Sequence, residues 1–209
     1  MGRWEPNARD RLAQAAMTLF QENGYDRTTV EEIAARAGLT ERTFFRYFAD
    51  KKEVLFGRSD AFHDLIATAI AGAPVGASPL DAVAAALEAM APIFKDSRER
   101  SRARQALLVA NAELRERELI KLASLASASA EALRRRGVTE PTASLAAEAG
   151  IAVFKVAFER WLDDPKAQDL SRHIQLGLDE LRAVTASTGP VTPAEPPRKS
   201  AKTARARKP

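Results

Sequence analysis

The sequence predicts an all-α protein of about nine helices. Apolar residues recur at intervals of three and four in almost every segment, which is the helical period. Capping residues and glycines separate these segments, and no two segments have the alternating pattern of paired strands. We expect an N-terminal three-helix domain in residues 6–65, including the start of a linking helix. A helical bundle in residues 66–186 and a disordered basic tail in residues 187–209 should follow.

Three closely spaced helices are expected at the N-terminus. The first covers residues 8–23 and ends before a glycine, which favours helix termination. The second begins after Thr29, which has capping-box spacing with Glu32, and closes at Gly38 after barely two turns. Thr40 is a new N-cap for a third short helix. A short helix, a turn with glycine and a second short helix have the spacing of a helix-turn-helix.

The third helix carries the unusual stretch "TFFRYF", residues 43–48. Aromatic residues favour strands, but a strand here would have no partner. As a helix, the stretch places Phe44 and Phe48 one turn apart and toward the core. Polar groups then occupy its other faces, where they either bind a partner or only solvate the surface: Thr40, Arg42, Thr43, Arg46 and Tyr47.

Later segments complete the expected bundle. Asp50 and Glu53 form a second capping-box pair, and we expect one long helix from here to residue 71, shared by both domains. Asp96 and Glu99 are expected to cap another helix. Arginines spread around that helix indicate a solvated surface: Arg98, Arg100, Arg102 and Arg104. The remaining helices are predicted in residues 79–94, 98–111, 113–136, 142–162 and 170–181.

Composition excludes several classes of protein. The chain has no cysteine and two distant histidines, His63 and His173, which argues against disulfides, zinc fingers and thiol catalysis. No Gly-rich phosphate loop, nucleophile–base set or metal-ligand cluster is visible, so we expect no enzyme activity, no cofactor and no metal. No apolar run reaches the roughly 18–20 residues of a membrane helix, and the N-terminus lacks a signal-peptide pattern. A cytoplasmic protein that does not bind membranes is expected.

The net charge of +4 is located mainly in the tail. From Gly189 onward, six basic residues face one glutamate, so the preceding 188 residues carry a net charge of −1. Any affinity for nucleic acid in the folded part must therefore depend on where its charges lie. The tail either adds phosphate attraction or only increases solubility.

Residues 9–56 resemble the TetR (tetracycline repressor) family of bacterial transcription regulators. The resemblance covers about a quarter of the chain. It implies a sequence-specific DNA-binding regulator, usually a ligand-responsive repressor that binds a palindromic operator as a homodimer. The residues that carry it are Ala16, Phe20, Gly24, Tyr25, Thr28, Thr29, Ile33, Ala34, Ala37, Gly38, Phe44, Tyr47, Phe48, Lys51 and Leu55.

The resemblance also implies roles for single residues. The helix-turn-helix would run from Thr29 to Phe48, with residues 40–47 as the recognition helix. Arg42 and Thr43 would read base edges, since arginine suits guanine and threonine suits a hydroxyl or methyl contact. Many relatives have tyrosine where this chain has Phe45, so an apolar contact to sugar or thymine methyl is expected there. The other candidates for DNA contact, mostly to phosphates, are Thr29, Thr40, Arg46, Tyr47, Lys51 and Lys52.

In family terms, residues 66–186 would bind an effector and form the dimer. The helix in residues 144–161 is apolar on nearly all sides, and Ala146, Ala147 and Gly150 permit close approach of another helix. Either it pairs with the last helix across a two-fold axis, or it is a fully buried central helix. A symmetric dimer would present two recognition helices to a palindrome.

The effector is not identified by the sequence. Candidates for a ligand pocket are Phe94, Gln105, Asn111, Phe154, Phe158 and Trp161, with the two amides as polar anchors. The alternative is that most of these side chains are ordinary core. The alternative function is a DNA-binding regulator without an effector, acting as an activator or a constitutive factor.

Overall fold

The computed structural model describes residues 7–57, 59–166 and 168–186. Within these residues the chain forms nine α-helices, two 3₁₀ helices and no strand, which confirms the all-α prediction. The tail predicted to be disordered, residues 187–209, lies outside the described residues. The elements in order are α1 (Ala8–Asn23), α2 (Val30–Arg36), α3 (Glu41–Tyr47), η1 (Lys52–Leu55), α4 (Ser59–Gly72), α5 (Pro79–Met90), η2 (Ala91–Phe94), α6 (Arg98–Ala110), α7 (Ala112–Arg135), α8 (Thr142–Asp163) and α9 (Leu170–Ala186).

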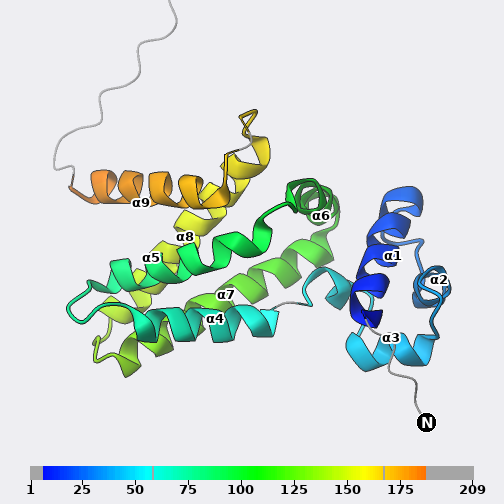
Figure 1. Ribbon diagram of the computed structural model, residues 1–209, viewed down its shortest axis with the longest axis horizontal. Coiled ribbons are helices and arrows are strands. Elements are labelled where there is room, and N and C mark those ends of the chain that lie inside the picture. Colours follow the sequence, from blue (N-terminus) through cyan, green and yellow to red (C-terminus); the bar gives the residue numbers. More distant parts are fainter. Residues whose placement is uncertain (1–6, 58, 167, 187–209) are drawn as a thin grey trace, which may run out of the picture.

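Two groups of helices divide the molecule (Figure 1). Helices α1–α3 gather at one end, and α4, α5, α7, α8 and α9 form an elongated bundle, while α6 lies between the two groups. Each group has its own apolar core. None of the helices in the described part of the chain is long and apolar enough to span a membrane.

The N-terminal group is held by a small aromatic core. Phe20, Ile33 and Phe44 come from α1, α2 and α3 and are at most 1% exposed. Two adjacent rings, Phe44 and Phe48, lie 5.4 Å apart between centroids. The helical reading of "TFFRYF" therefore holds, since α3 is a helix and Phe44 and Phe48 are buried in this core.

The single long helix expected from Asp50 to residue 71 is broken. The Asp50 carboxylate does accept a hydrogen bond from the Glu53 N–H at 3.0 Å, as the capping spacing predicted. The turn that follows is a short 3₁₀ helix, η1, and the backbone leaves helical geometry at Phe56 and Gly57 before α4 begins. The cap at Asp50 therefore starts only a four-residue 3₁₀ helix, and this helix does not continue into α4.

The bundle packs tightly where glycines allow it. A methyl group built on Gly150 of α8 would lie 2.3 Å from Val83 Cγ1 of α5, so this glycine permits contact between these two helices. Gly177 of α9 similarly faces Val153 of α8, at 3.1 Å. The close approach expected at Gly150 for a partner subunit is therefore used inside this subunit. Ala147 is buried as well.

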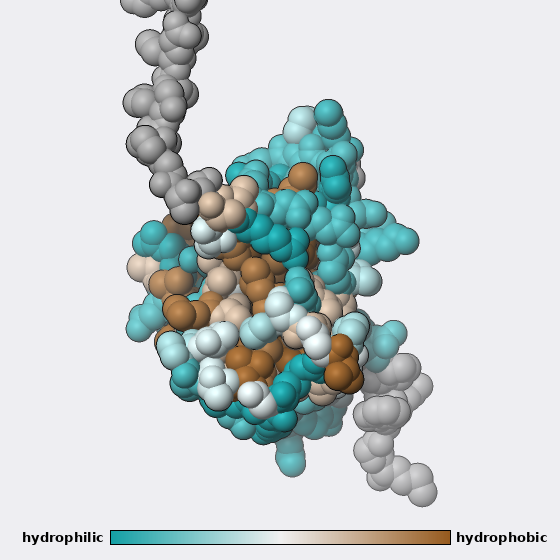
Figure 2. Space-filling view, turned by 90° about the vertical axis from the view of Figure 1, so that its left-hand side faces the viewer, coloured by the Kyte–Doolittle hydropathy of each residue, from teal (hydrophilic) through white to brown (hydrophobic). Residues whose placement is uncertain are grey.

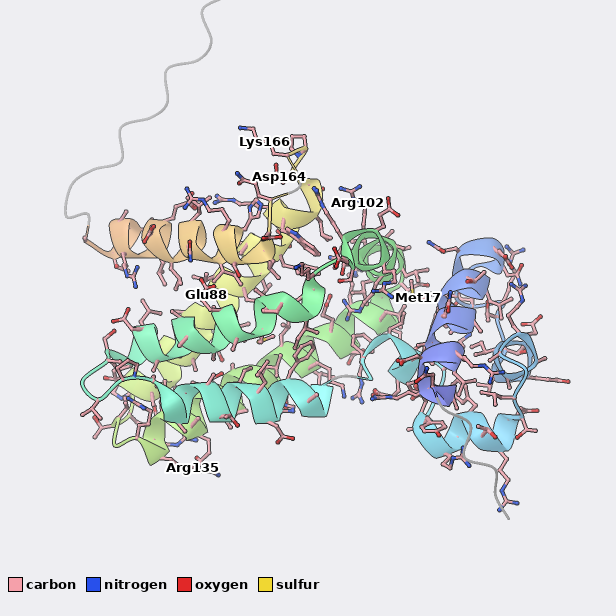
Figure 3. The ribbon with its side chains drawn as sticks, in the orientation of Figure 1. Met17, Glu88, Arg102, Arg135, Asp164 and Lys166 are labelled. Atoms are coloured by element: carbon pink, nitrogen blue, oxygen red, sulfur yellow. The ribbon has the colours of Figure 1, made fainter. Side chains whose placement is uncertain are left out.

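Arginines satisfy carbonyls at several helix ends. Arg98 donates to the carbonyls of Leu162 (3.0 Å) and Asp164, and Arg102 donates to Leu162. Arg102 of α6 thus reaches the end of α8, beside Asp164 (Figure 3). The solvated role expected for these arginines is wrong for Arg98 and Arg102, because the last carbonyls of α8 need donors. Arg100 is exposed, as expected. Asp96, expected as a cap of α6, has a φ of 58° and precedes the N-cap position at Ser97.

Hydrophobic side chains also reach the surface at the end of the bundle away from α1–α3. Figure 2 looks onto this end and shows apolar groups in its centre, rimmed by hydrophilic ones. Leu145 of α8 is 66% exposed and Val184 of α9 is 72% exposed. Val156 of α8 and Leu176 of α9 are also exposed apolar side chains of these two helices. Large exposed apolar patches on a protein are typical of interaction surfaces.

Candidate nucleic-acid interface

Helix α3 is fixed at its start by two threonines. Thr40 has an extended backbone, and its hydroxyl accepts a hydrogen bond from the Thr43 N–H at 3.2 Å. The hydroxyls of Thr40 and Thr43 are also 3.1 Å apart and hydrogen-bonded. This N-cap starts the helix where the sequence predicted it. Thr43 can still present its methyl group and hydroxyl outward, since its side chain is only half-buried.

Aromatic packing sets which face of α3 is free. Phe44 is fully buried, and its ring contacts Phe45 edge-on at 5.5 Å. Phe45 itself is 54% exposed, so an apolar ring lies on the outer face of α3. Arg42 is exposed beside it and has no hydrogen-bond partner among the described residues. The Arg42 guanidinium and the Phe45 ring, which packs against Phe44, therefore lie on the exposed side of α3.

Arg46 and Tyr47 form a pair at the end of α3. The Arg46 guanidinium lies 4.9 Å from the centre of the Tyr47 ring and donates to the Tyr47 hydroxyl at 3.3 Å. Stacking of this kind restricts a long side chain without neutralising its charge. The pair thus holds a positive charge and a hydroxyl at one position, as contacts to a phosphate require.

The N-terminus of α2 is already satisfied by its own side chains. The Glu32 N–H donates to the Thr29 hydroxyl at 3.2 Å, and the Thr29 N–H donates to the Glu32 carboxylate at 2.8 Å. The Thr29 hydroxyl donates to the same carboxylate. This confirms the predicted capping box. It also places a negative charge where the resemblance implied a phosphate contact by Thr29.

Lys51 lies inside the helix-turn-helix unit instead of facing outward. Its Nζ donates to three carbonyls, at 2.7 Å to Tyr25, 3.2 Å to Asp26 and 2.9 Å to Thr28. An ammonium has three protons, so all of its donors are used. The same Nζ lies 4.4 Å from the centre of the Tyr25 ring. Lys51 therefore ties the α1–α2 loop to the segment after α3. Its contact with phosphate stays a prediction.

Tyr25 is buried beneath Lys51. Burial raises the pKa of the Tyr25 phenol to about 12, and the carboxylates of Glu113, Asp50 and Asp26 act in the same direction. The hydroxyl therefore stays protonated over the whole physiological range. Tyr25 and Lys51 thus contact each other through both the Tyr25 carbonyl and its ring.

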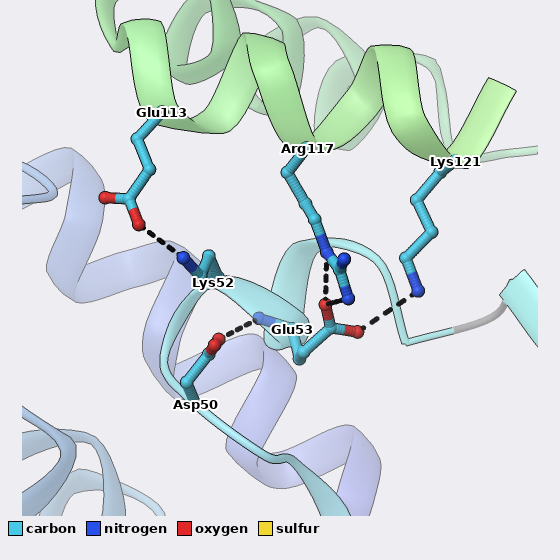
Figure 4. Close-up of polar contacts among 6 residues, drawn as sticks. All are labelled: Asp50, Lys52, Glu53, Glu113, Arg117 and Lys121. Carbon is cyan, nitrogen blue, oxygen red and sulfur yellow. Dashed lines mark hydrogen bonds and ion pairs between the residues drawn. The ribbon is translucent and has the colours of Figure 1, made fainter. Parts of the chain in front are cut away.

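Lys52, another candidate for phosphate contact, pairs with a carboxylate of α7. Its ammonium contacts the Glu113 carboxylate of α7, and this hydrogen bond lowers the pKa of Glu113 and raises the pKa of Lys52. The next residue, Glu53, pairs with Arg117 and Lys121 of the same helix (Figure 4). These pairs were not predictable from local patterns, because they join residues more than 60 positions apart. The one available signal was the spacing of Glu113, Arg117 and Lys121, which places three charges on one face of α7.

Family comparisons match this arrangement. The family described as "Bacterial regulatory proteins, tetR family" matches residues 12–57, which span α1 to η1. The family described as "MftR C-terminal domain" matches residues 77–186, more than half of the chain. The chain belongs to the TetR family of DNA-binding transcriptional regulators.

Individual TetR-family proteins are similar over different lengths. The HTH-type transcriptional regulator TcmR of Streptomyces glaucescens is 39% identical over 88 residues, which are 42% of this chain and 39% of that protein. The putative mycofactocin biosynthesis transcriptional regulator MftR of Mycobacterium tuberculosis is 25% identical over 78% of this chain and 84% of that protein. Among solved structures, a SmeT–triclosan complex has a TM-score of 0.56 at 24% identity, with 93% of this chain and 99% of that chain covered. SmeT is the repressor of a multidrug efflux pump of Stenotrophomonas maltophilia.

The structure brings four of the six ligand candidates of this TetR-family chain together. The rings of Phe94, Phe154, Phe158 and Trp161 form a cluster with centroid distances of 5.4–6.2 Å. Asn111, in contrast, lies at the α6–α7 junction and donates to the Leu107 carbonyl at 2.7 Å. Gln105 is half-buried on α6. The four rings pack together in the bundle core, in line with the alternative that most of these side chains are ordinary core, and Asn111 is used locally. A ligand site among the rings stays a prediction.

Proposed function

We propose that this TetR-family protein is a ligand-responsive repressor that binds a palindromic operator as a homodimer. The observation that carries the proposal is the exposed face of α3, where Arg42 is free and Phe45 is held edge-on by a buried ring. A short helix with a buried aromatic side and a donor-bearing outer side suits the DNA major groove.

Each outward residue has a role that fits its chemistry. Arg42 reads guanine through its O6 and N7 atoms, and Thr43 contributes a methyl or hydroxyl contact to a neighbouring base. Phe45 packs on a thymine methyl or on sugar. Arg46 and Tyr47 bind phosphate, which positions α3 without selecting sequence. Thr29 and Thr40 act through the helix N-termini that they cap, because their hydroxyls and the Thr29 N–H are occupied internally.

Exposed apolar residues on α8 and α9 support a dimer. Leu145, Val156, Leu176 and Val184 are all large, apolar and at least 36% exposed. Pairing these two helices with their copies across a two-fold axis would bury them. The two recognition helices would then lie about one turn of DNA apart, roughly 34–36 Å.

The aromatic cluster supports a small, apolar effector. Phe94 contacts three other aromatic rings of the predicted set. SmeT, a repressor with a similar fold, is known in complex with triclosan, which is why an aromatic site is proposed in this chain. The close packing of the rings also favours a second candidate function, a regulator without an effector. Ligand-shift melting separates the two, because a compound that binds the folded state raises the melting temperature.

Selection from a library of random duplexes tests the proposal. We expect an inverted repeat with half-sites about one helical turn apart. Sedimentation of the protein with this duplex should give two chains for each duplex. Enrichment of no sequence, or of a single half-site bound by a monomer, would contradict the proposed function.

A further inference from the structure

The DNA-binding unit is not joined to the bundle by one continuous helix. The chain passes from η1 through Phe56 and Gly57, neither of which is helical, before α4 begins at Ser59. A helix transmits rotation because its backbone hydrogen bonds are continuous, and that continuity is interrupted here. The orientation of α1–α3 on the bundle must therefore be set by contacts in space.

Those contacts come from the α6–α7 corner. Leu108 of α6 and Leu114 of α7 are fully buried in the core formed by α1, α2, α3 and η1. The buried residues of α4, Ile66 and Ile70, belong instead to the bundle core. The α6–α7 corner is thus part of both units. Apolar contact of this kind provides affinity but little angular preference, because hydrophobic burial is non-directional.

Polar contacts between η1 and α7 restrict the angle between the DNA-binding unit and the bundle. The Glu53 carboxylate accepts from Arg117 Nε at 2.7 Å and also pairs with Lys121 at 3.4 Å (Figure 4). The Glu53 side chain is only 16% exposed, so these pairs are partly shielded from water. Lys52 binds Glu113 one turn of α7 earlier. Consecutive residues of η1 are therefore attached to three successive turns of α7.

Arg104 of α6 completes the attachment from the other side. Its Nε donates to the Leu55 carbonyl at 2.9 Å, its guanidinium lies 4.9 Å from the centre of the Phe56 ring, and it pairs with Glu118 of α7 at 3.0 Å. Beside the Glu53 pairs, a cleft of about 250 Å³ has Tyr47, Glu53 and Arg117 in its walls. On this side the units are not closely packed against each other, so we expect the charged contacts of Glu53 to restrict the angle between them.

Movement of η1 is transmitted directly to α3. Four residues separate the two elements, and Lys51 among them is bonded to three carbonyls of the α1–α2 loop. The rings of Phe44 and Phe48 bind the same segment to the core. The unit of α1, α2, α3 and η1 therefore tilts as one piece.

We propose that Glu53, held by Arg117 and Lys121 of α7, is a positioning residue that fixes the tilt of the DNA-binding unit on the bundle and thereby sets the half-site spacing that the dimer reads. This proposal rests on the proposed function. In a dimer, a tilt of each unit changes the distance and the relative rotation of the two copies of α3. Loss of the Glu53 contacts widens the range of tilts, so the dimer accepts more spacings.

The test measures spacing discrimination. A duplex enriched on the full-length wild-type protein is remade with its half-sites one or two base pairs closer or farther apart. Each base pair changes their separation by about 3.4 Å and their relative rotation by about 35°. The readout is the ratio of the dissociation constant at an altered spacing to that at the enriched spacing. Partial unfolding lowers binding to all duplexes alike and leaves this ratio unchanged.

Glu53→Gln should lower the ratio by about 2- to 30-fold, the range in which single positions change coupling between sites. Arg117→Gln should lower the ratio by a similar factor. The double variant should lower it little further, because both changes remove the same contact between Glu53 and Arg117. Arg117→Lys keeps the charge and should retain most of the discrimination. The matched control is Glu131→Gln, since Glu131 also pairs with two arginines but lies at the far end of α7.

The outcomes separate this proposal from the proposed function. If no inverted repeat is enriched, the proposed function fails and this proposal fails with it. If an inverted repeat is enriched but Glu53→Gln and Arg117→Gln keep the wild-type ratio, this proposal alone is overturned. A variant of Glu53 that does not fold is replaced by Arg117→Gln and Lys121→Gln, and an unchanged ratio in both overturns the proposal equally.

Discussion

Replacing Lys51 by methionine separates an internal role for this lysine from a role in binding phosphate. Methionine keeps an unbranched apolar stem of similar length but has no N–H group. The substitution leaves the carbonyls of Tyr25, Asp26 and Thr28 without the donor that they share. Two of these bonds are partly buried and the third is exposed, so water can replace only part of what is lost.

The expected loss of stability follows from these contacts. Each partly buried bond to a charged donor contributes about 1 kcal/mol after partial resolvation, and the contact with the Tyr25 ring contributes about 0.5 kcal/mol. The free energy of unfolding should therefore fall by about 2–3 kcal/mol. For a chain of this size, that loss lowers the melting temperature by about 5–10 °C.

Thermal unfolding followed by circular dichroism measures this shift, with Lys95→Met as the control because Lys95 is exposed and remote from α1–α3. DNA affinity is measured in parallel by fluorescence anisotropy at several salt concentrations. A phosphate-binding lysine would behave differently: its loss would leave the melting temperature unchanged and reduce the slope of log affinity against log salt by about 1. That result would refute the internal role of Lys51.

Three further predictions concern single positions. Arg42→Ala should cost about 1–3 kcal/mol on the enriched operator and relax selection at one base pair, and an equal loss on random DNA would contradict its role as a base reader. In a Tyr47→Phe background, absorbance at 295 nm reports Tyr25 alone, which should titrate near pH 12. Because its pKa is raised on folding, stability should decline as the pH climbs from about 10, where the unfolded tyrosine ionises, toward 12; titration near 10 in the folded protein would exclude this. Gly150→Ala should destabilise the bundle by about 1–3 kcal/mol through contact with Val83, and Val83→Ala should restore part of that loss, whereas additive losses would show that the two positions do not touch.

Elements with local signals were predictable from the sequence. The caps at Thr29 and Thr40 depend on residues three positions away, and both are present in the structure. The inward orientation of Phe44 and Phe48 follows from their one-turn spacing, and both are buried. Such features depend on a few neighbouring residues, so periodicity and spacing are sufficient to identify them.

Contacts between distant segments were not predictable. Glu53 had the spacing of a capping-box partner and was read as opening a long helix, whereas its carboxylate binds α7, 64 residues later. The sequence predicts close approach of another helix at Gly150, but it does not indicate whether that helix is α5 of the same chain or a helix of a second subunit. Lys51 matches the family pattern, and the resemblance implied a contact between Lys51 and phosphate. Its bonds to three carbonyls could not be predicted, because these carbonyls come together only in the folded chain.

The distribution of basic side chains now suggests how the DNA-binding unit balances affinity and specificity. Around α3, most cations are engaged within the protein: Arg9 with the Phe48 ring, Arg11 with the Ala37 carbonyl, Arg27 with the Asn23 carbonyl, Arg36 with Glu22, Lys51 with the α1–α2 loop and Lys52 with Glu113. These contacts hold a very small core together and fix where the charges lie, and Arg36 and Lys52 are paired with carboxylates. The cations held by rings or carbonyls keep their charge and attract phosphate without selecting sequence. Arg42 is the cation of α3 without such a partner in the described part of the chain. Discrimination by the folded unit should therefore depend more on base contacts of Arg42 and on the spacing of two recognition helices than on its overall charge.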